Sequence, residues 1–220
     1  GGTGMNVFNP ALVARAFVFF AYPSKITGDK VWINGLSDGL KTVDGVTGAT
    51  PLSEAALDKI DMLPSLSDLF FGFIPGSIGE TSKLAIILGA IILIISGVGS
   101  ARIMISTVIG GIIMTLIFNA FAVTNYMTVD PLTQLMMGGF MFGAVFMATD
   151  PVTGAQTPWG KIIYGLLIGM FAIMIRVFNP AYPEGMMLSI LLMNTFAPLI
   201  DHVIIQRHIK KRITRTIVKN

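Results

Sequence analysis

The sequence predicts an all-α integral membrane protein, and three observations lead to this fold class. Of the 220 residues, 53% are hydrophobic and only 12% are charged, whereas an ordinary soluble domain carries about 25% charged residues. The mean hydropathy is +0.76. Long runs without any charged residue recur from residue 84 onwards. A soluble fold of this length could not cover its exterior with polar groups, so the composition excludes that class.

Charge-free runs locate the expected membrane spans, because a helix needs about 20 mostly apolar residues to cross the hydrocarbon. The last two runs approach this length by including Arg176 and Asp201, and Pro10–Tyr22 adds a span or half-helix. We therefore expect about five to six transmembrane helices or half-helices. The five charge-free runs are Leu84–Ala101, Ile103–Val129, Pro131–Thr149, Ile162–Ile175 and Gly185–Ile200.

The chain divides into four parts. Residues 1–22 are a first segment with a span or half-helix, and residues 23–83 are a polar loop that holds eight of the twelve acidic residues. Residues 84–205 are expected to form a bundle of about five transmembrane helices. Residues 206–220 are a basic tail, whose basic residues are Arg207, Lys210, Lys211, Arg212, Arg215 and Lys219.

The basic tail predicts the orientation in the membrane. Under the positive-inside rule the tail is cytoplasmic, and counting spans back from it makes the 23–83 loop extracytoplasmic. Arg176 then lies near an outer end, so we expect it to be a buried functional or structural charge, paired with Glu184. No folded basic domain accompanies the tail, so a nucleic-acid partner is not expected.

The absence of cysteine restricts the redox chemistry. It excludes disulfides, thiolate nucleophiles and cysteine-ligated zinc or iron–sulfur centres. The two histidines, His202 and His208, are too few to hold a haem or a metal cage. Any redox cofactor of this chain must therefore be organic, or a neighbouring protein must hold it.

An Asn-Pro-Ala element occurs twice, at Asn9–Ala11 and at Asn179–Ala181. Repeated Asn-Pro elements at helix ends are typical of membrane folds with inverted repeats and broken helices. The water-channel family also uses two Asn-Pro-Ala elements, although arginine follows the second one there and Tyr182 follows it here. A solute channel or transporter without flavin is therefore the alternative from a different functional class.

The polar loop contains Asp-Gly-Val-Thr-Gly-Ala-Thr-Pro-Leu at residues 44–52. Its glycines permit unusual backbone angles and remove side-chain bulk. Pro51 favours an extended conformation for Thr50 and keeps the threonine hydroxyl out of helical hydrogen bonding. The loop is thus expected to present an accessible hydroxyl. The alternative is a surface turn into an amphipathic helix over Leu52–Leu63, with Thr50 or Ser53 as its N-cap.

This pattern resembles the flavinylation motif Asp-Gly-x-Thr-Gly-Ala-Thr, in which a flavin transferase links FMN through its phosphate to the last threonine. The resemblance implies Thr50 as the acceptor of covalent FMN, with Asp44 at the acidic position of the motif. A near-copy that ends at Thr157 is broken by Gln156 and is not expected to accept flavin. The remaining motif residues are Thr47, Gly48 and Ala49.

Further blocks, spread in order over the chain, resemble the NqrB family, the flavin-bearing membrane component of the sodium-translocating NADH:quinone oxidoreductase. The related RnfD component of the Rnf complex, a ferredoxin:NAD oxidoreductase ion pump, shares the motif and is the alternative. Its members usually carry Gly-Gly-Tyr-Pro-Asp-Gly where this chain has Asn-Pro-Ala-Tyr-Pro-Glu-Gly. The blocks are Gly-Gly-Thr-Gly-Met-Asn-Val-Phe-Asn-Pro-Ala (1–11), Met-Ala-Thr-Asp-Pro-Val (147–152), Asn-Pro-Ala-Tyr-Pro-Glu-Gly-Met-Met (179–187) and Leu-Met-Asn-Thr-Phe-Ala-Pro-Leu-Ile-Asp (192–201).

The resemblance implies an inverted-repeat fold of roughly ten helices, about twice as long as this chain, which would be its C-terminal part. The quinone site generally assigned to the family would then lie in the preceding part. The implied function is electron transfer from NADH to a quinone such as ubiquinone, with Na⁺ export, in the bacterial inner membrane. The implied partners are a second protein with covalent FMN, an iron–sulfur membrane pair and, during maturation, a flavin transferase. The chain would not be catalytically complete alone.

Four polar residues outside the motif receive roles from the resemblance. Asn6 and Asn9 are candidates for binding a second flavin, riboflavin, through their amide groups; the alternative for Asn9 is capping of the helix that begins at Pro10. Asp150 and Asp201 are candidates for a Na⁺ path, since carboxylates at membrane depth are costly and usually functional. The alternatives are a turn cap for Asp150 and pairing with a tail lysine for Asp201.

Overall fold

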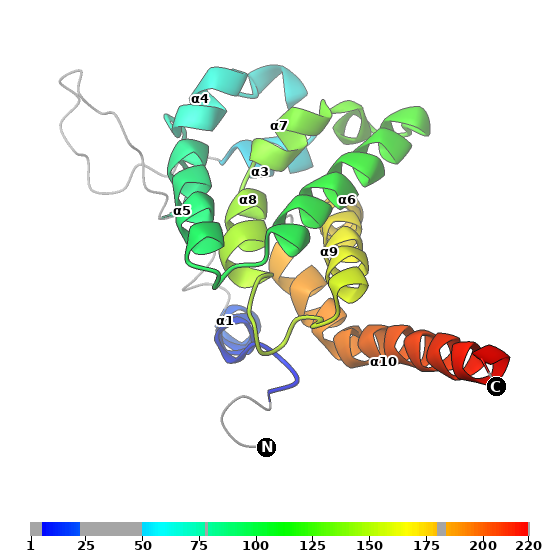
Figure 1. Cartoon of the computed structure of the whole chain (residues 1–220). Coiled ribbons are helices and arrows are strands. Elements are labelled where there is room, and N and C mark those ends of the chain that lie inside the picture. Colours follow the sequence, from blue (N-terminus) through cyan, green and yellow to red (C-terminus); the bar gives the residue numbers. More distant parts are fainter. Residues whose placement is uncertain (1–5, 23–49, 78, 180–183, 220) are drawn as a thin grey trace.

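The computed structural model describes residues 6–22, 50–77, 79–179 and 184–219, and every regular element there is a helix (Figure 1). The all-α fold class is thereby confirmed. Three helices are long and apolar enough to cross a membrane: α6 (Ala101–Ala120), α9 (Pro158–Phe178) and α10 (Met186–Lys219), the last over Met186–Thr214. The shorter apolar helices are α1 (Pro10–Ala21) and α5 (Lys83–Ile95).

The remaining elements are single turns or short helices. They lie between α1 and α5 or between α6 and α9. They are α3 (Pro51–Ala56), η1 (Ile60–Met62), α4 (Leu66–Phe71), η2 (Asn125–Thr128), α7 (Pro131–Met136), α8 (Phe140–Phe142) and the π-helical turn η3 (Gly143–Met147).

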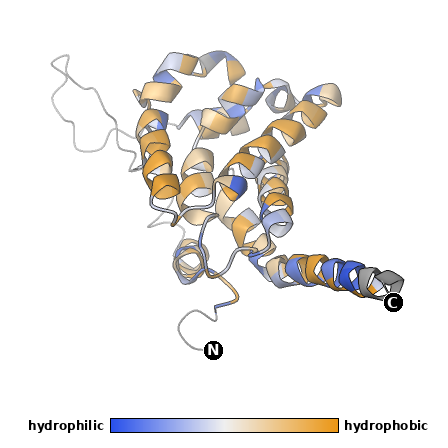
Figure 2. Ribbon diagram, viewed as in Figure 1, coloured by the Kyte–Doolittle hydropathy of each residue, from blue (hydrophilic) through white to orange (hydrophobic). Residues whose placement is uncertain are grey.

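Hydrophobic residues predominate along α5 and α6, as expected in a lipid environment (Figure 2). On α5, Leu88, Ile92 and Ile95 are 54%, 66% and 80% exposed. A contiguous apolar surface of this kind marks a membrane or protein contact. The hydropathy pattern therefore agrees with membrane insertion.

Helices α6 and α9 pack backbone to backbone through small residues. A Cβ atom built on Gly110 of α6 would collide with the backbone carbonyl of Leu166, and one built on Gly169 of α9 would collide with that of Thr107. Gly165 faces the side chain of Ser106 in the same way. Small residues at such spacing let membrane helices approach closely. Van der Waals contacts then hold the helices together, because the hydrophobic effect does not act between helices in lipid.

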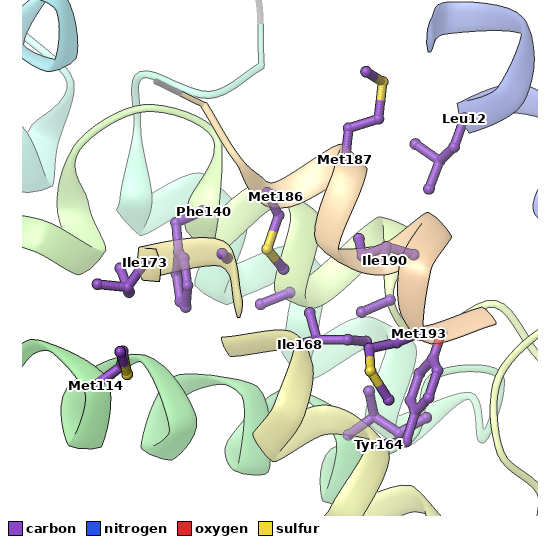
Figure 3. Packing of buried hydrophobic residues seen from close by; sticks show 14 of the residues in the cluster. Leu12, Met114, Phe140, Tyr164, Ile168, Ile173, Met186, Met187, Ile190 and Met193 are labelled. Carbon is purple, nitrogen blue, oxygen red and sulfur yellow. The ribbon is translucent and has the colours of Figure 1, made fainter. Parts of the chain in front are cut away.

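Helices α10 and α1 complete the core around α9. Figure 3 shows Met186, Ile190 and Met193 of α10 directed toward Ile168 and Tyr164 of α9. Leu12 of α1 belongs to the same hydrophobic core and is only 3% exposed. The methionine-rich composition thus serves packing, as flexible thioether side chains fill irregular gaps.

The charge-free run Pro131–Thr149 does not form one continuous span. It consists of α7, a break at residues 137–139, α8 and the turn η3. The break occurs because Gly138 adopts φ +57°, which ends the helical path. The same run therefore contributes two half-length pieces, an arrangement found where membrane proteins build binding sites.

We expect Gly110→Leu to lower the free energy of unfolding by about 1–3 kcal/mol or more, because the new side chain must displace the Leu166 backbone. Ala120→Leu adds volume at an exposed position of the same helix and should change it by less than about 0.5 kcal/mol. Thermal unfolding in detergent, followed by circular dichroism, measures both. Equal midpoints for the two variants would contradict the close packing of α6 and α9.

Candidate functional site

The candidate site is centred on the break between α7 and α8. The helical path ends before Gly138, so the Gln134 carbonyl has no helical amide to accept from. The carbonyls of Met137 and Gly138 also need donors from elsewhere. In an apolar environment such groups must be satisfied within the protein, since no bulk water reaches them. The residues that supply these donors define the site.

Arg176 of α9 supplies most of them. Its Nη1 donates to the Gln134 carbonyl at 2.6 Å and its Nη2 to the Met137 carbonyl at 3.0 Å. Its Nε donates to the Glu184 carbonyl at 3.3 Å. The side chain is 0% exposed, and the guanidinium lies 5.6 Å from the centre of the Phe140 ring, within the range of a cation–π contact. The predicted burial of Arg176 is confirmed, and its hydrogen bond to Glu184 is to the backbone.

Lys83 brings a second cation to the same break. It is the first residue of α5 and only 1% exposed. Its Nζ donates to the carbonyl of Gly138 at 3.2 Å and also to the carbonyl of Glu80. Two basic side chains from different helices therefore converge on three neighbouring carbonyls.

Two carboxylates also lie close to the break. A Cβ atom built on Gly139 would lie 2.8 Å from Glu184 Oε1 and 3.1 Å from Glu80 Oε2. Glu184 also forms an ion pair with Arg15 of α1 at 3.1 Å, which ties the start of the chain to this cluster. The resulting arrangement balances the buried positive charge and fixes four segments of the chain at one point.

Thr50, the predicted flavin acceptor, lies close to the break. It is the N-cap of α3: its Oγ1 accepts a hydrogen bond from the Ser53 amide at 3.2 Å, and the Ser53 hydroxyl donates back to the Thr50 carbonyl at 2.8 Å. Two residues later, Leu52 packs against Gly138, where a Cβ atom would lie 2.8 Å from its Cδ2. The Thr50 side chain is half-buried, so its hydroxyl is held in place and still reachable.

The rest of the motif, Asp44, Thr47, Gly48 and Ala49, lies outside the described residues. The helix predicted over Leu52–Leu63 is shorter than expected and consists of α3 and η1. The chain turns at Asp58, whose Oδ1 accepts a hydrogen bond from the Tyr126 amide at 3.0 Å. This tertiary hydrogen bond ends the amphipathic helix and joins the loop to η2.

Asn9 has the capping role that was the alternative to flavin binding. Its Oδ1 accepts hydrogen bonds from the amides of Ala11 and Leu12, at 3.0 and 3.3 Å, and so caps α1. Asn6 is exposed ahead of this helix. Nearby on α10, the buried side chain of Asn194 is 2.7 Å from the Tyr164 hydroxyl. The riboflavin roles of Asn6 and Asn9 stay a prediction.

Asp201 and Asp150 lie at the opposite end of α9, around the loop that precedes it. Asp201 accepts hydrogen bonds from the amides of Gln156 (2.7 Å) and Thr157 (3.0 Å) and from the Thr157 hydroxyl (2.6 Å). Asp150 accepts from the Val152 amide at 3.1 Å and the Thr153 hydroxyl at 2.7 Å. Both carboxylates thus order this loop. The Thr157 hydroxyl of the near-copy motif already donates a hydrogen bond to Asp201.

Among the described residues, no group of three His, Cys, Asp or Glu side chains could hold a metal ion.

Sequence reasoning missed Lys83 and Glu80 as site residues, although a lysine directly before a charge-free run is an unusual signal. It also missed a buried polar pair beside Arg176. Within the described part of the chain, Tyr126 Oη and Gln134 Oε1 are buried without a hydrogen-bond partner. Burial raises the pKa of the Tyr126 phenol, so this hydroxyl stays neutral at physiological pH.

Known proteins of one family match nearly the whole chain. The profile of the NQR2, RnfD, RnfE family matches residues 1–210. The chain is 49% identical over 220 residues to the B subunit of the Na(+)-translocating NADH-quinone reductase of Chromohalobacter salexigens, covering 98% of this chain and 52% of that protein. It is 48% identical to the corresponding protein of Pseudomonas paraeruginosa over 221 residues, covering 98% and 53%. The chain therefore spans about half the length of these relatives.

We expect Arg176→Met to lower the free energy of unfolding by about 2 kcal/mol or more, because it leaves the buried carbonyls of Gln134 and Met137 without their donors, each costing about 1–3 kcal/mol. Arg102→Met, at an exposed position of α6, should change it by less than about 0.5 kcal/mol. Denaturant titration in detergent gives both values. A stability of Arg176→Met equal to that of Arg102→Met would show that the break does not depend on the guanidinium.

Proposed function

Since the chain belongs to the NQR2, RnfD, RnfE family, we propose that it is the flavin-carrying C-terminal part of the B subunit of a Na⁺-translocating NADH:quinone reductase. In this proposal Thr50 carries FMN through a phosphoester bond. The flavin supplies reversible electron transfer when it is attached. Electrons originate from NADH and end on quinone, with Na⁺ export, in the complete complex of the bacterial inner membrane.

The observation that carries the proposal is the setting of Thr50. Its hydroxyl oxygen is held by the Ser53 amide at the first turn of α3, and α3 rests on Gly138 through Leu52. The hydroxyl is therefore fixed relative to the membrane helices while its side chain remains partly exposed. The fit to a phosphoester is good, because the linkage needs only this oxygen and leaves α3 in place.

The charged residues near Thr50 hold the site together. Arg176 and Lys83 bring two buried basic groups to the break, and the carboxylates of Glu80 and Glu184 lie beside it and offset their charge. Leu52 of α3 packs on Gly138 at the same break. We propose that this network keeps α3, and with it a flavin on Thr50, at a constant position against the membrane helices.

Asp150 and Asp201 are proposed to belong to the Na⁺ path at the other end of α9. Their oxygens are hard ligands, which Na⁺ prefers. Asp150 begins the 150–157 loop, and Asp201 of α10 binds the end of the same loop. The accepted hydrogen bonds hold both carboxylates in fixed positions. A similar proposal for Asn6 and Asn9 has weaker support, because the Asn9 Oδ1 already caps α1.

The alternative assignments have less support. The RnfD component of an Rnf-type pump belongs to the same family, but the relatives that cover this chain at 46–49% identity are named as B subunits of Na(+)-translocating NADH-quinone reductases. A flavin-free channel or transporter has no support among these relatives. The predicted partners, including a second protein with covalent FMN, an iron–sulfur membrane pair and a flavin transferase, remain part of the proposal.

We expect Thr50→Asn to abolish covalent flavin while leaving the fold intact, because asparagine caps a helix as well as threonine does but offers no hydroxyl. The protein is coexpressed with a flavin transferase, and in-gel flavin fluorescence and the mass of the tryptic peptide 42–59 are measured. Ser53→Ala is the matched control, since it removes the neighbouring hydroxyl and should keep the flavin. Flavin retained on Thr50→Asn would overturn the assignment.

We expect Asp201→Asn, in the complete complex, to weaken the Na⁺ dependence of quinone reduction, because it removes one negative charge from the proposed path. Thr157→Val is the control: it removes the hydroxyl partner of Asp201 but keeps the carboxylate. Quinone reduction is measured against Na⁺ concentration. If both variants change Na⁺ activation equally, Asp201 only orders the loop, and the ion-path role is wrong.

A further inference from the structure

The C-terminal half of α10 extends beyond the helix bundle. Helix α10 has 34 residues and is therefore about 51 Å long, whereas the hydrocarbon core of a bilayer is about 30 Å thick. It contains Pro198, and its C-terminal part projects away from the other helices (Figure 1). The residues after Ile204, which is buried against α9, must therefore lie in another environment than the core.

This projecting part has two chemically distinct faces. Ile205, Ile209 and Ile213 recur every four residues and so line one face; they are 49%, 43% and 55% exposed. Arg207 and Lys211 lie on the opposite face, whereas Arg212, three residues after Ile209, borders the isoleucine stripe. All three are exposed. No acidic residue occurs after Asp201. A helix with a strong apolar stripe and a basic face is typical of a segment that lies in the membrane interface.

A groove where α9 begins marks the level of that interface. Trp159, the second residue of α9, is 63% exposed, and tryptophan is enriched where hydrocarbon meets the headgroups. One cavity beside it, of about 290 Å³, is lined by Trp159, Ile163, Ile204, Arg207, His208 and Lys211. A neighbouring cavity, of about 490 Å³, adds Ile205, Ile209 and Arg212 to the lining. The walls are therefore apolar toward the bundle and basic toward the tail.

We propose that residues 205–219 of α10 form an interfacial helix that binds anionic phospholipid, with lipid phosphate held beside Trp159 by Arg207, Lys211 and Arg212. The isoleucine stripe faces the acyl chains, and the basic side chains reach the headgroups. Anionic phosphate is the partner that the charge selects, because the groove offers basic groups and the segment after Asp201 has no acid. The inference does not depend on the flavin chemistry.

The absence of cysteine allows a direct test on the full chain in nanodiscs. A nitroxide at Ile209→Cys reports the apolar stripe, and one at Thr214→Cys reports the polar side of the same helix. Nanodiscs contain either phosphatidylcholine alone or an equimolar mixture with phosphatidylglycerol. Relaxation by oxygen and by a water-soluble nickel chelate measures the depth of each label.

We expect the label at residue 209 to be accessible to oxygen and protected from the chelate in the anionic nanodiscs, and less protected in the neutral ones. The label at residue 214 should stay accessible to the chelate in both.

Replacing Arg207, Lys211 and Arg212 together by glutamine should reduce the number of phosphatidylglycerol molecules retained in native mass spectrometry by about tenfold. The control Lys59→Gln with Arg102→Gln should leave it unchanged.

Three outcomes would overturn the proposal. One is a label at residue 209 that is as accessible to the chelate as the label at residue 214 in anionic nanodiscs. Another is equal protection with and without phosphatidylglycerol, together with unchanged lipid retention in the triple variant. The third is protection that occurs only after assembly with other proteins of the complex, which would identify a protein as the partner of this surface.

Discussion

The guanidinium of Arg176 satisfies the backbone of a broken helix inside an apolar bundle, and the rest of the structure depends on this arrangement. A break at this depth would otherwise leave carbonyls without donors, at a cost that a marginally stable protein cannot sustain. One side chain joins α9, the end of α7 and the chain before α10 through three hydrogen bonds. Lys83 adds α5 to the same point. The break is thus a junction of four segments.

The two ends of α9 use the same principle with opposite charge. At one end Arg176, a buried cation, binds backbone carbonyls of a neighbouring segment. At the other end Asp201, an anion on α10, binds the backbone amides of Gln156 and Thr157. Each charged side chain reaches from one helix to the backbone of another segment. Because α9 packs closely against α6 through glycines on both helices, these two anchors position both loops relative to this helix pair.

The sequence was sufficient to predict the all-α membrane fold. Charged side chains are costly in lipid, so membrane-spanning segments are visible in the sequence as charge-free runs. It also predicted the burial of Arg176 and the capping alternatives for Thr50 and Asn9, which depend on local chemistry. The break at Gly138 could not be predicted: a Gly-Gly pair in an apolar run equally favours close helix packing. Its partners Lys83 and Glu80 lie far away in the chain, and only tertiary structure brings them together. The same holds for the hydrogen bond between the Asp58 carboxylate and the η2 backbone, which shortened the predicted helix.

The two glycines at the break differ in what they would tolerate during evolution. Gly138 is restricted by its own backbone, since its positive φ disfavours any side chain. Gly139 is restricted by its neighbours, because a Cβ atom there would meet the carboxylates of Glu80 and Glu184. A side chain at position 139 would therefore require the flexible carboxylate ends of Glu80 and Glu184 to move, or a shorter residue at position 80 or 184, whereas no movement of a neighbour changes the backbone angle of Gly138. Covariation among positions 80, 139 and 184 would thus record the history of the carboxylate pair.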